Sequence, residues 1–531
     1  MSKKLRSIVL VSLLVFLTGS VLFAKAIYPL NTDVTLTWWM DLHANVALIA
    51  KNFGDTEFAK ELQKRTGVKI KFLHPAVGQA REAFNLMLAS GDLPDIIEYN
   101  WFDIPGGPNS ALENGYILKL NPIIDKWAPN LKNYLKKHPI YNKMVKTDEG
   151  SYYVFPFIRG DQSLIATSGP MVRKDWLDEL GLKVPETLDD WYTVLKAFKE
   201  KKGANPPFTC EAMGTGLNGS VAATYVNQTF EGGADSYHDF YIDRGKVKYG
   251  LLDPQRKAYL ALMNKWYNEG LIDKNFGTNT RKVVDANIMT GKSGVAYGSG
   301  GSGIGRYMDA MAGKDPKSFS LVGVPFPTPK RGQLPRFSFL TPPTGPKNNG
   351  SAAISTKCKN VEAAARLLDY AYSPQGNLFY NFGMEGVSYK MVNNYPTYTP
   401  LIMKNPEGLP NTTVMSKYMR GHTNGPFVQD KRYLEQYYER PEQKAAMVNW
   451  SKTSFLKYMM PPVTPTPKES EELSKIMNDV NTYNDEMTMK FIMGVESVST
   501  GYDGYVAQLK KLGIERAIQI YQIAYARYLK R

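Results

Sequence analysis

The 531-residue chain is poor in the residues that build disulfide scaffolds and metal centres. It has two cysteines and five histidines, and no histidines stand at the spacing of metal ligands. The H-E-x-x-H zinc motif and the G-x-S-x-G hydrolase motif are absent as well. These absences argue against a disulfide-dense scaffold, a Cys-rich zinc protein and two large classes of hydrolase. Cys210 and Cys358 either pair in an oxidising compartment or serve as two buried apolar side chains, and the sequence leaves both open.

Long hydrophobic runs are also missing, with one exception near the N-terminus. Residues 8–23 are mostly apolar, follow a basic cluster and precede Ala24-Lys25-Ala26, a small-x-small cleavage site. This pattern predicts a signal peptide over residues 1–26, cleaved after Ala26, rather than an uncleaved membrane anchor. Ser20 stands where a lipoprotein signal carries its cysteine, and a hydroxyl cannot form the thioether, so we expect no lipid anchor. No later run reaches about 20 residues, so no second span is expected.

Acidic residues are outnumbered, with 50 against 65 lysines and arginines and a formal charge of +15. Removal of residues 1–26 takes away four positive charges and no acids, which leaves +11. Such a balance admits a nucleic acid, an anionic membrane or an acidic ligand as partner. The basic residues are scattered, and an exported protein meets little nucleic acid, so we expect a solute and no nucleic acid as ligand.

The chain does contain a regular alternation of strand and helix patterns. Residues 34–38, 68–72 and 95–99 read as strands, and helices are predicted from about 55 to Gly67 and over 82–90. This order predicts a parallel α/β sheet. The same signals return in helices 191–201, 256–270 and 361–372, in strands 294–297 and 352–355, and in a helical tail over 469–494, 502–512 and 515–530. Proline-rich breaks at 325–329, 342–346 and 461–467 are interpreted as hinges or crossovers.

Two glycine-rich segments match nucleotide-binding motifs only in part. Gly291-Lys292-Ser293 resembles the end of a P-loop, but Ala286 replaces the required glycine. Gly298, Gly300 and Gly303 match the dinucleotide fingerprint, but no acid follows at the expected distance. We interpret this second segment as a loop that presents a helix N-terminus to a ligand. Two carboxylate pairs, Asp92/Asp95 and Asp189/Asp190, have structural interpretations. Asp92 is interpreted as a turn former and Asp189 as a helix cap, so neither pair is assigned as the acid and nucleophile of a glycosidase.

Aromatic residues are the informative class, with 33 tyrosines, 23 phenylalanines and eight tryptophans. Tyrosine and tryptophan combine an apolar face with a hydrogen-bonding tip, which suits the rings and hydroxyls of a sugar. Trp38-Trp39 and Tyr99-Asn100-Trp101 both fall at the carboxyl ends of predicted strands, the edge where open α/β sheets bind ligands. The competing interpretation is that one tryptophan of each pair belongs to the core.

Seven short segments, each weak alone, form a pattern when taken together. Leu88 to Ile96 follows the second predicted helix, and residues 148–153 carry closely spaced Asp, Gly and paired Tyr residues. The other five lie at 173–177, 182–187, 291–294, 362–376 and 383–389. In this pattern the chain resembles the family-1 extracellular solute-binding proteins of ABC importers, in the large branch that includes alginate-oligosaccharide binders. The resemblance covers nearly all of the mature chain.

The resemblance implies a two-lobed, periplasmic-binding-protein-like (type II) α/β fold with a hinge and extra C-terminal helices. Residues 27–158 would form the first part of the N-terminal lobe, and residues 159–350 would form mainly the C-terminal lobe. Residues 351–531 would form the remainder of the C-terminal lobe, the crossovers and the helical tail. The protein would bind an oligosaccharide, neutral or acidic, between the lobes and deliver it to the transmembrane permease subunits. It would act as a periplasmic or extracellular monomer without a cofactor and catalyse nothing.

Two departures from the relatives carry expectations of their own. Alginate-binding relatives have a calcium loop after the helix that matches 191–201, but residues 202–207 offer too few oxygen ligands here, so we expect no metal there. Where an alginate binder has tryptophans in the second lobe, this chain has Tyr297-Gly298-Ser299 and Phe427-Val428. The ring spacing or size of the ligand is therefore expected to differ.

The candidate ligand residues lie at strand ends and in loops. Arg159 is a candidate for a bidentate contact with a uronate carboxylate, and the competing interpretation is a surface ion pair with Asp161. About half of the candidates are expected to contact ligand, because binding sites have few polar anchors. The full set is Trp39, His43, Trp101, Arg159, Asp161, Tyr297, Glu385, Tyr389, Phe427, Gln429 and Tyr433.

Two other functions stay open at this point. An exported enzyme acting on polysaccharides would need a clustered Tyr/His/Arg or two-carboxylate site, which the sequence does not show. A binding protein for a peptide or another non-sugar solute is disfavoured only modestly, by the aromatic strand ends.

Overall fold

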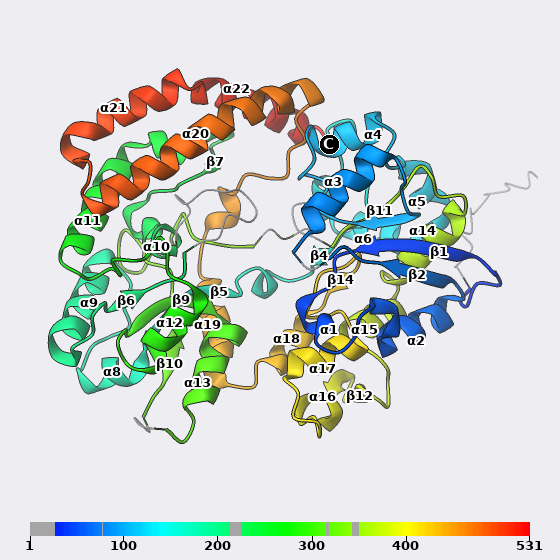
Figure 1. Cartoon of the computed structure of the whole chain (residues 1–531), viewed down its shortest axis with the longest axis horizontal. Helices are drawn as coiled ribbons and strands as arrows, with labels where there is room; N and C mark the ends of the chain where they lie inside the picture. The colour runs from blue at the N-terminus through cyan, green and yellow to red at the C-terminus, as the bar shows by residue number, and fades with distance from the viewer. Residues whose placement is uncertain (1–26, 77, 213–224, 315–317, 342, 344–349) are drawn as a thin grey trace, which may run out of the picture.

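The structure, a computed structural model, describes residues 27–76, 78–212, 225–314, 318–341, 343 and 350–531. Two four-stranded sheets, each covered by helices, form two lobes that stand side by side in Figure 1. The two-lobed α/β fold expected from the sequence is therefore present. The predicted signal peptide over residues 1–26 lies outside the described residues. Within the described part, no helix is both long and apolar enough to cross a membrane.

The sheet of the first lobe has the strand order β11-β3-β1-β2. Strand β1 pairs in parallel with both β2 and β3, so that Trp38 stands opposite Phe72 on one side and Ile96 on the other. Strand β11 adds to β3 in the antiparallel sense. The carboxyl ends of β1 and β3 therefore meet at one edge of the sheet. The strands are β1 (Thr35–Met40), β2 (Lys69–Leu73), β3 (Ile96–Glu98) and β11 (Ala352–Ile354).

The two helices predicted for this lobe form and end where their glycines require. Helix α2 (Glu57–Thr66) ends at Gly67 and α3 (Ala80–Ser90) at Gly91, both in the left-handed region. A Cβ on Gly67 would lie 2.2 Å from a backbone oxygen of Leu30, so no other residue fits there. The remaining elements of the lobe are α1 (Ala44–Ala47), α4 (Gly107–Glu113), α5 (Asn121–Trp127), α6 (Pro129–Lys137), α7 (Pro139–Met144), α14 (Val361–Tyr370), α15 (Pro374–Phe382), β12 (Tyr389–Val392), β13 (Tyr395–Tyr398), α16 (Pro400–Met403) and α17 (Asn411–Tyr418).

The sheet of the second lobe has the order β10-β5-β9-β6. Strand β9 pairs antiparallel with β5 and parallel with β6. Its elements are β5 (Ser168–Arg173), α8 (Lys174–Glu179), α9 (Leu188–Lys202), β6 (Phe208–Thr209), α10 (Tyr225–Phe230), β7 (Phe240–Asp243), β8 (Lys246–Tyr249), α11 (Pro254–Asn268), α12 (Arg281–Met289), β9 (Val295–Ser299), α13 (Arg306–Met311), β10 (Leu321–Gly323) and α19 (Pro441–Trp450).

Two local expectations prove wrong in this lobe. The cap of α9 is Thr187, which shares a capping box with Asp190, so Asp189 is not the cap. The glycines after β9 form a π-helical turn, Gly300–Gly305, rather than a loop that presents a helix end to a ligand. A Cβ on Gly300 would lie 2.7 Å from the ring of Tyr438, so the glycine serves close packing. Cys210 and Cys358 are both buried and unpaired, in the cores of different lobes, which settles the open question against a disulfide.

The connections between the lobes run through the middle of Figure 1. There β4 (Ile158–Arg159) and β14 (Val428–Gln429) form a short parallel pair. The chain leaves the first lobe after β4, and it leaves that lobe again through α18 (Lys431–Tyr437) toward α19. We call this pair of strands, which lies where the chain passes between the lobes, the pivot.

Three long helices follow at the C-terminus and lie along the second lobe before returning toward the first (Figure 1). They are α20 (Pro467–Met493), α21 (Val498–Lys511) and α22 (Ile514–Leu529). Their apolar side chains, such as Val480, Phe491 and Ile520, belong to the largest core of the second lobe. The predicted helical tail is thus packed structure that is continuous with that lobe.

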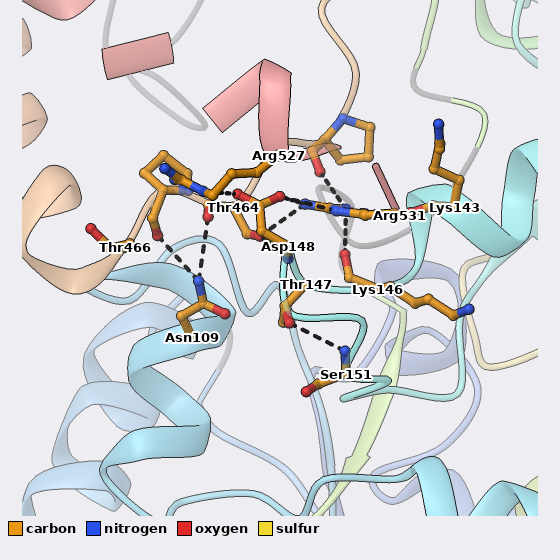
Figure 2. A network of polar contacts seen from close by, with 12 residues as sticks. Asn109, Lys143, Lys146, Thr147, Asp148, Ser151, Thr464, Thr466, Arg527 and Arg531 are labelled. Atoms are coloured by element: carbon orange, nitrogen blue, oxygen red, sulfur yellow. Dashed lines mark hydrogen bonds and ion pairs between the residues drawn. The ribbon is translucent and has the colours of Figure 1, made fainter. Parts of the chain in front are cut away.

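A buried polar cluster ties the end of this tail to the first lobe, as Figure 2 shows. Asp148, in a turn of the first lobe, accepts hydrogen bonds from Arg527 Nε at 2.7 Å and from Arg531 Nε at 3.0 Å. Thr464 joins the cluster because its hydroxyl oxygen accepts from the backbone N–H of Asp148 at 2.9 Å. Arg527 also pairs with Glu469 at the start of α20. We call Asp148, Arg527 and Arg531 the C-terminal brace.

Candidate functional site

The carboxyl ends of β1 and β3 open into a cavity of about 150 Å³, which we call the N-lobe cavity. Carboxylate, imidazole, hydroxyl and amide groups stand among its apolar side chains. This mixture is typical of sites that orient a polar ligand with a few hydrogen bonds. Its walls are Met40, Asp41, His43, Val46, Phe53, Glu98, Tyr99, Gly350, Ser416, Met419, Arg420, Thr423 and Asn424.

A buried ion pair forms one wall of the N-lobe cavity. Arg420 donates Nη1 to Glu98 Oε2 at 3.0 Å and Nη2 to Oε1 at 2.7 Å, and both side chains are almost fully buried. The guanidinium also lies 5.4 Å from the centre of the Phe53 ring. A bidentate pair of this kind holds its two planes rigidly, so the wall is fixed before a ligand arrives.

One histidine, His43, lines the N-lobe cavity, and a second, His422, packs against it. The rings of His43 and His422 meet edge to face at 5.9 Å, and one nitrogen of His422 contacts the hydroxyl of Ser416 at 2.8 Å. Burial, His43 and the charge of Arg420 lower the pKa of His422 to about 3. Burial and Arg420 lower the pKa of His43 as well. Both rings are therefore neutral at pH 7 and able to donate and accept hydrogen bonds.

The lowered pKa of His422 makes stability depend on pH. In the unfolded chain a histidine binds its proton near pH 6.5, whereas folded His422 stays neutral down to about pH 3. The unfolded state therefore gains a proton first on acidification, and the free energy of unfolding falls with a slope of up to about 1.4 kcal/mol per pH unit. We expect His422→Gln to remove this slope between pH 6.5 and 4, measured as urea midpoints. Equal slopes in the variant and the parent would contradict the assignment.

A second, larger cavity of about 410 Å³ lies between the lobes, and we call it the inter-lobe cavity. The first lobe contributes the segment after β3, and the second contributes the β7 region, the 460–465 connection and the C-terminal helices. Its walls are Phe102, Ile104, Gly106, Gly107, Pro108, His238, Asp239, Phe240, Tyr249, Met460, Val463, Thr464, Pro465, Ser470, Leu473, Ser474, Met477, Asn481, Asn484 and Tyr521.

The segment after β3 connects the two cavities. Tyr99 lines the N-lobe cavity and Phe102 lines the inter-lobe cavity. Three residues span at most about 11 Å, so the two cavities lie within reach of one extended ligand. Both lie at the carboxyl edge of the first sheet, where the fold class places its ligands.

Arg159 lies at the pivot between the lobes, on β4. Its Nη1 donates to Gln429 Oε1 at 3.3 Å, and its guanidinium lies 5.1 Å from the centre of the Phe157 ring. Burial lowers its pKa, and Nε has no hydrogen-bond partner among the described residues. The competing interpretation, an ion pair of Arg159 with Asp161, is wrong. Asp161 instead caps the turn at Ser163 and pairs with Lys431 at 3.5 Å.

Four predicted site residues lie near the pivot or near the cavities, but their side chains are buried. Gln429 donates Nε2 to the carbonyl of Gly421 and is buried. Tyr433 is buried in the cluster beside the pivot, where burial raises its pKa. Trp39 packs at 5.8 Å from Tyr99, and Trp101 is 1% exposed against Phe84. The two tryptophans thus belong to the core below the cavity edge, as the competing interpretation had it.

The remaining predicted residues do not converge on one place. Phe427 is fully buried between Phe157 and Tyr380, so it has no face for a ligand in this conformation. Tyr297 is buried under Tyr225, with ring centres 4.5 Å apart, and its hydroxyl has no partner among the described residues. Glu385 is exposed in a turn beside buried Tyr389, and neither residue lines either cavity. Of the predicted residues, only His43 lines one of them.

Several wall residues were not among those predicted from the sequence. Arg420, Thr423 and Asn424 reach the N-lobe cavity from a segment more than 300 positions after β3, and no local pattern marks them. Glu98 lies at the end of a predicted strand, and that position could have marked it as a candidate wall residue. The polar residues of α20 that line the inter-lobe cavity were not predicted either, because the sequence of this helix looks like that of any solvent-exposed helix.

The segment that follows α9 does not fit a calcium ion. Gly203 ends the helix, Ala204 is buried, and the backbone N–H of Asn205 donates to Lys292. Residues 202–207 contain no carboxylate, and calcium needs six or more oxygen ligands in most protein sites.

Comparisons with known proteins agree on one family. The sequence profile described as "Bacterial extracellular solute-binding protein" matches residues 50–378. The fructooligosaccharide ABC transporter substrate-binding protein FusA of Streptococcus pneumoniae serotype 4 is 25% identical, over 94% of this chain and 92% of that protein. The polygalacturonan/rhamnogalacturonan-binding protein YtcQ of Bacillus subtilis is 25% identical over 45% of this chain and 46% of its own length.

A solved structure shows the same architecture at full length. The crystal structure of the alginate-binding protein AlgQ2 without calcium ion superimposes with a TM-score of 0.73 at 28% sequence identity. The match covers 94% of this chain and 100% of that one. The C-terminal helices and both lobes are therefore shared features.

Proposed function

The chain belongs to the bacterial extracellular solute-binding proteins, and from this premise we propose that it captures an oligosaccharide between its lobes for an ABC importer. The observation that carries the proposal is the pair of mixed polar and aromatic cavities at the carboxyl edge of the first sheet. The neutral imidazole of His43, amides and hydroxyls suit sugar hydroxyls, and nearby rings suit sugar faces. Relatives named for fructooligosaccharide, polygalacturonan and alginate binding support a carbohydrate ligand.

In the proposed cycle, the protein is exported, binds its sugar as a monomer and delivers it to the transmembrane permease subunits without changing it. The lobes close about the β4–β14 pair, because a hinge of a few residues absorbs such a rotation. Closure would create the surface that the permease recognises. Small-angle scattering at saturating ligand is expected to show a smaller radius of gyration than the free protein, and an unchanged radius would contradict closure.

Intrinsic fluorescence with a panel of neutral and acidic oligosaccharides tests the ligand class. Trp39 lies next to the N-lobe cavity wall and packs on Tyr99, so binding there is expected to change the emission. A peptide that shifts the emission when no sugar does would favour a non-sugar solute. Conversion of any glycan into shorter or unsaturated products would favour an enzyme instead.

We further propose that the ligand carries uronate groups and that Arg159 contacts one carboxylate. Its Nε lacks a partner among the described residues, and charged hydrogen bonds contribute about 1.5–3 kcal/mol. Arg159→Gln is therefore expected to weaken binding of an oligogalacturonate by about 10–100-fold and to leave a neutral oligosaccharide unaffected, measured by calorimetry.

Lys431→Gln is the matched control for Arg159→Gln, because Lys431 carries the same charge nearby but is half exposed and pairs with Asp161. It is expected to bind both sugars like the parent protein. An equal loss for neutral and acidic sugars in Arg159→Gln would show that the residue acts through the hinge and not through a carboxylate.

A further inference from the structure

Lysines outnumber acids on the part of the first lobe that is built from α5, α6 and α7. Residues 126–146 contain no aspartate or glutamate. Leu131 and Leu135 turn one side of α6 into the core of the lobe, so the exposed pair Lys136 and Lys137 at the helix end lies on the outer side. Neither lysine of this pair forms an ion pair with a residue that the structure describes. The lysines of the segment are Lys126, Lys132, Lys136, Lys137, Lys143 and Lys146.

The end of α22 extends this basic surface. Lys143 of α7 donates Nζ to the backbone carbonyl of Leu529 at 2.9 Å, so the next residue, the exposed Lys530, adjoins α7. The C-terminal brace lies alongside, as Figure 2 shows, but it does not cancel the charge of the lysines. Its two arginines already face two carboxylates, those of Asp148 and Glu469. The surface therefore keeps a net positive charge.

Two large apolar side chains are exposed on the same surface. Ile140, the second residue of α7, is 69% exposed, and Leu529 is 53% exposed. Ile140 precedes Lys143 by three positions and therefore shares its side of the helix. Lys137 stands three residues before Ile140, within about 11 Å along the chain. We call Lys136, Lys137, Ile140, Lys143, Leu529 and Lys530 the basic patch.

Lysines around exposed aliphatic side chains match the two layers of an anionic membrane surface. The amino groups meet the lipid phosphates, and each lysine near such a surface strengthens binding about fivefold. The aliphatic side chains enter the boundary between headgroups and acyl chains. A nucleic acid or another polyanion would use the lysines alone and would leave Ile140 and Leu529 in water.

We propose that the basic patch docks the protein on a membrane surface that contains anionic phospholipids. The inference goes beyond the proposed function, because the patch contains no residue of either cavity and the docking needs no sugar. Docking of this kind concentrates the protein at a membrane by charge and by shallow insertion, and it weakens as salt screens the charges.

Sedimentation of the mature protein with phospholipid vesicles tests the docking. The parent protein is expected to bind vesicles of mixed phosphatidylglycerol and phosphatidylcholine at low salt. It should bind pure phosphatidylcholine vesicles far more weakly, and about 1 M salt should release it, because charges are then screened beyond about 3 Å. Lys136→Gln with Lys137→Gln is expected to weaken binding about 25-fold, which is about fivefold for each lysine. Ile140→Asn is expected to weaken it about 5–10-fold, because its side chain no longer enters the interface.

Lys510→Gln with Lys511→Gln is the matched control, since this lysine pair is also exposed, also ends a helix, α21, and removes the same charge. It is expected to bind the vesicles like the parent. Equal losses in the two double variants would overturn the patch as the docking site, and so would a parent protein that does not bind the anionic vesicles. Parental binding by Ile140→Asn would overturn the membrane as the partner and favour a polyanion. Sugar affinity, measured in parallel by calorimetry, should be parental in every variant, so the proposed function is tested separately.

Discussion

Glu98→Gln should destabilise the protein by about 3–5 kcal/mol, the usual loss when one partner of a buried ion pair is removed. The substitution keeps the shape of the side chain and leaves the charge of Arg420 buried without a carboxylate. Arg420 would then keep only neutral partners, the backbone carbonyl of Asn424 and the Phe53 ring, while its Nε has no partner among the described residues. Urea unfolding followed by tryptophan fluorescence measures the change. Ligand affinity should fall as well, because the pair forms a wall of the N-lobe cavity.

The double variant Glu98→Met with Arg420→Met separates stability from binding. Replacing a buried pair with apolar side chains of similar volume is often neutral or stabilising, so the double variant should recover most of the lost stability. It should not recover affinity, because the polar wall is gone. A loss below about 1 kcal/mol in Glu98→Gln would contradict the account of a desolvated pair, since that is the range of exposed pairs.

Asp148→Asn should release the C-terminal brace and destabilise the protein by about 3 kcal/mol. The side chain of Asp148 is 1% exposed and neutralises Arg531, which is fully buried. The expected loss lies at the lower end for buried pairs, because Arg527 is 27% exposed and keeps Glu469 as a partner. Hydrogen exchange of α22 gives an independent measure, since its amides should exchange faster once the helix is no longer held against the first lobe.

Glu472→Gln is the matched control for the brace. Glu472 also pairs with an arginine of α22, Arg516, but both side chains are exposed. The control should leave the urea midpoint and the exchange of α22 unchanged. Exchange of α22 at the parental rate in Asp148→Asn would show that apolar packing on the second lobe holds the helix without the brace.

The secondary structure near the first sheet was predictable because its signals are local. Gly67 and Gly91 ended the helices α2 and α3 as expected, since a left-handed residue without a Cβ is readable from sequence. The strands β1 to β3 followed from alternation and apolar runs. The cap of α9 was misplaced by two residues because Thr187, Asp189 and Asp190 can all serve as caps, and only the reciprocal bond of the capping box selects one.

The candidate site was far less predictable than the fold. Strand-end aromatics such as Trp101 and Tyr297 looked suited to a ligand, but packing from distant segments buries them. Arg420 became a wall residue only because the chain returns to β3 after more than 300 positions. Contacts over such distances depend on tertiary packing, which periodicity and spacing do not encode. His43, three residues after the end of β1, was the one predicted ligand residue that lines a cavity, and its place after a strand end made it predictable.

A calorimetric titration of the mature protein with oligogalacturonates, followed by chromatography of the recovered sugar, tests the central claim most directly. The account predicts saturable binding at one site per chain and recovery of the sugar at its original length. Recovery of shortened or unsaturated products would contradict the claim that this protein binds and delivers an oligosaccharide without changing it.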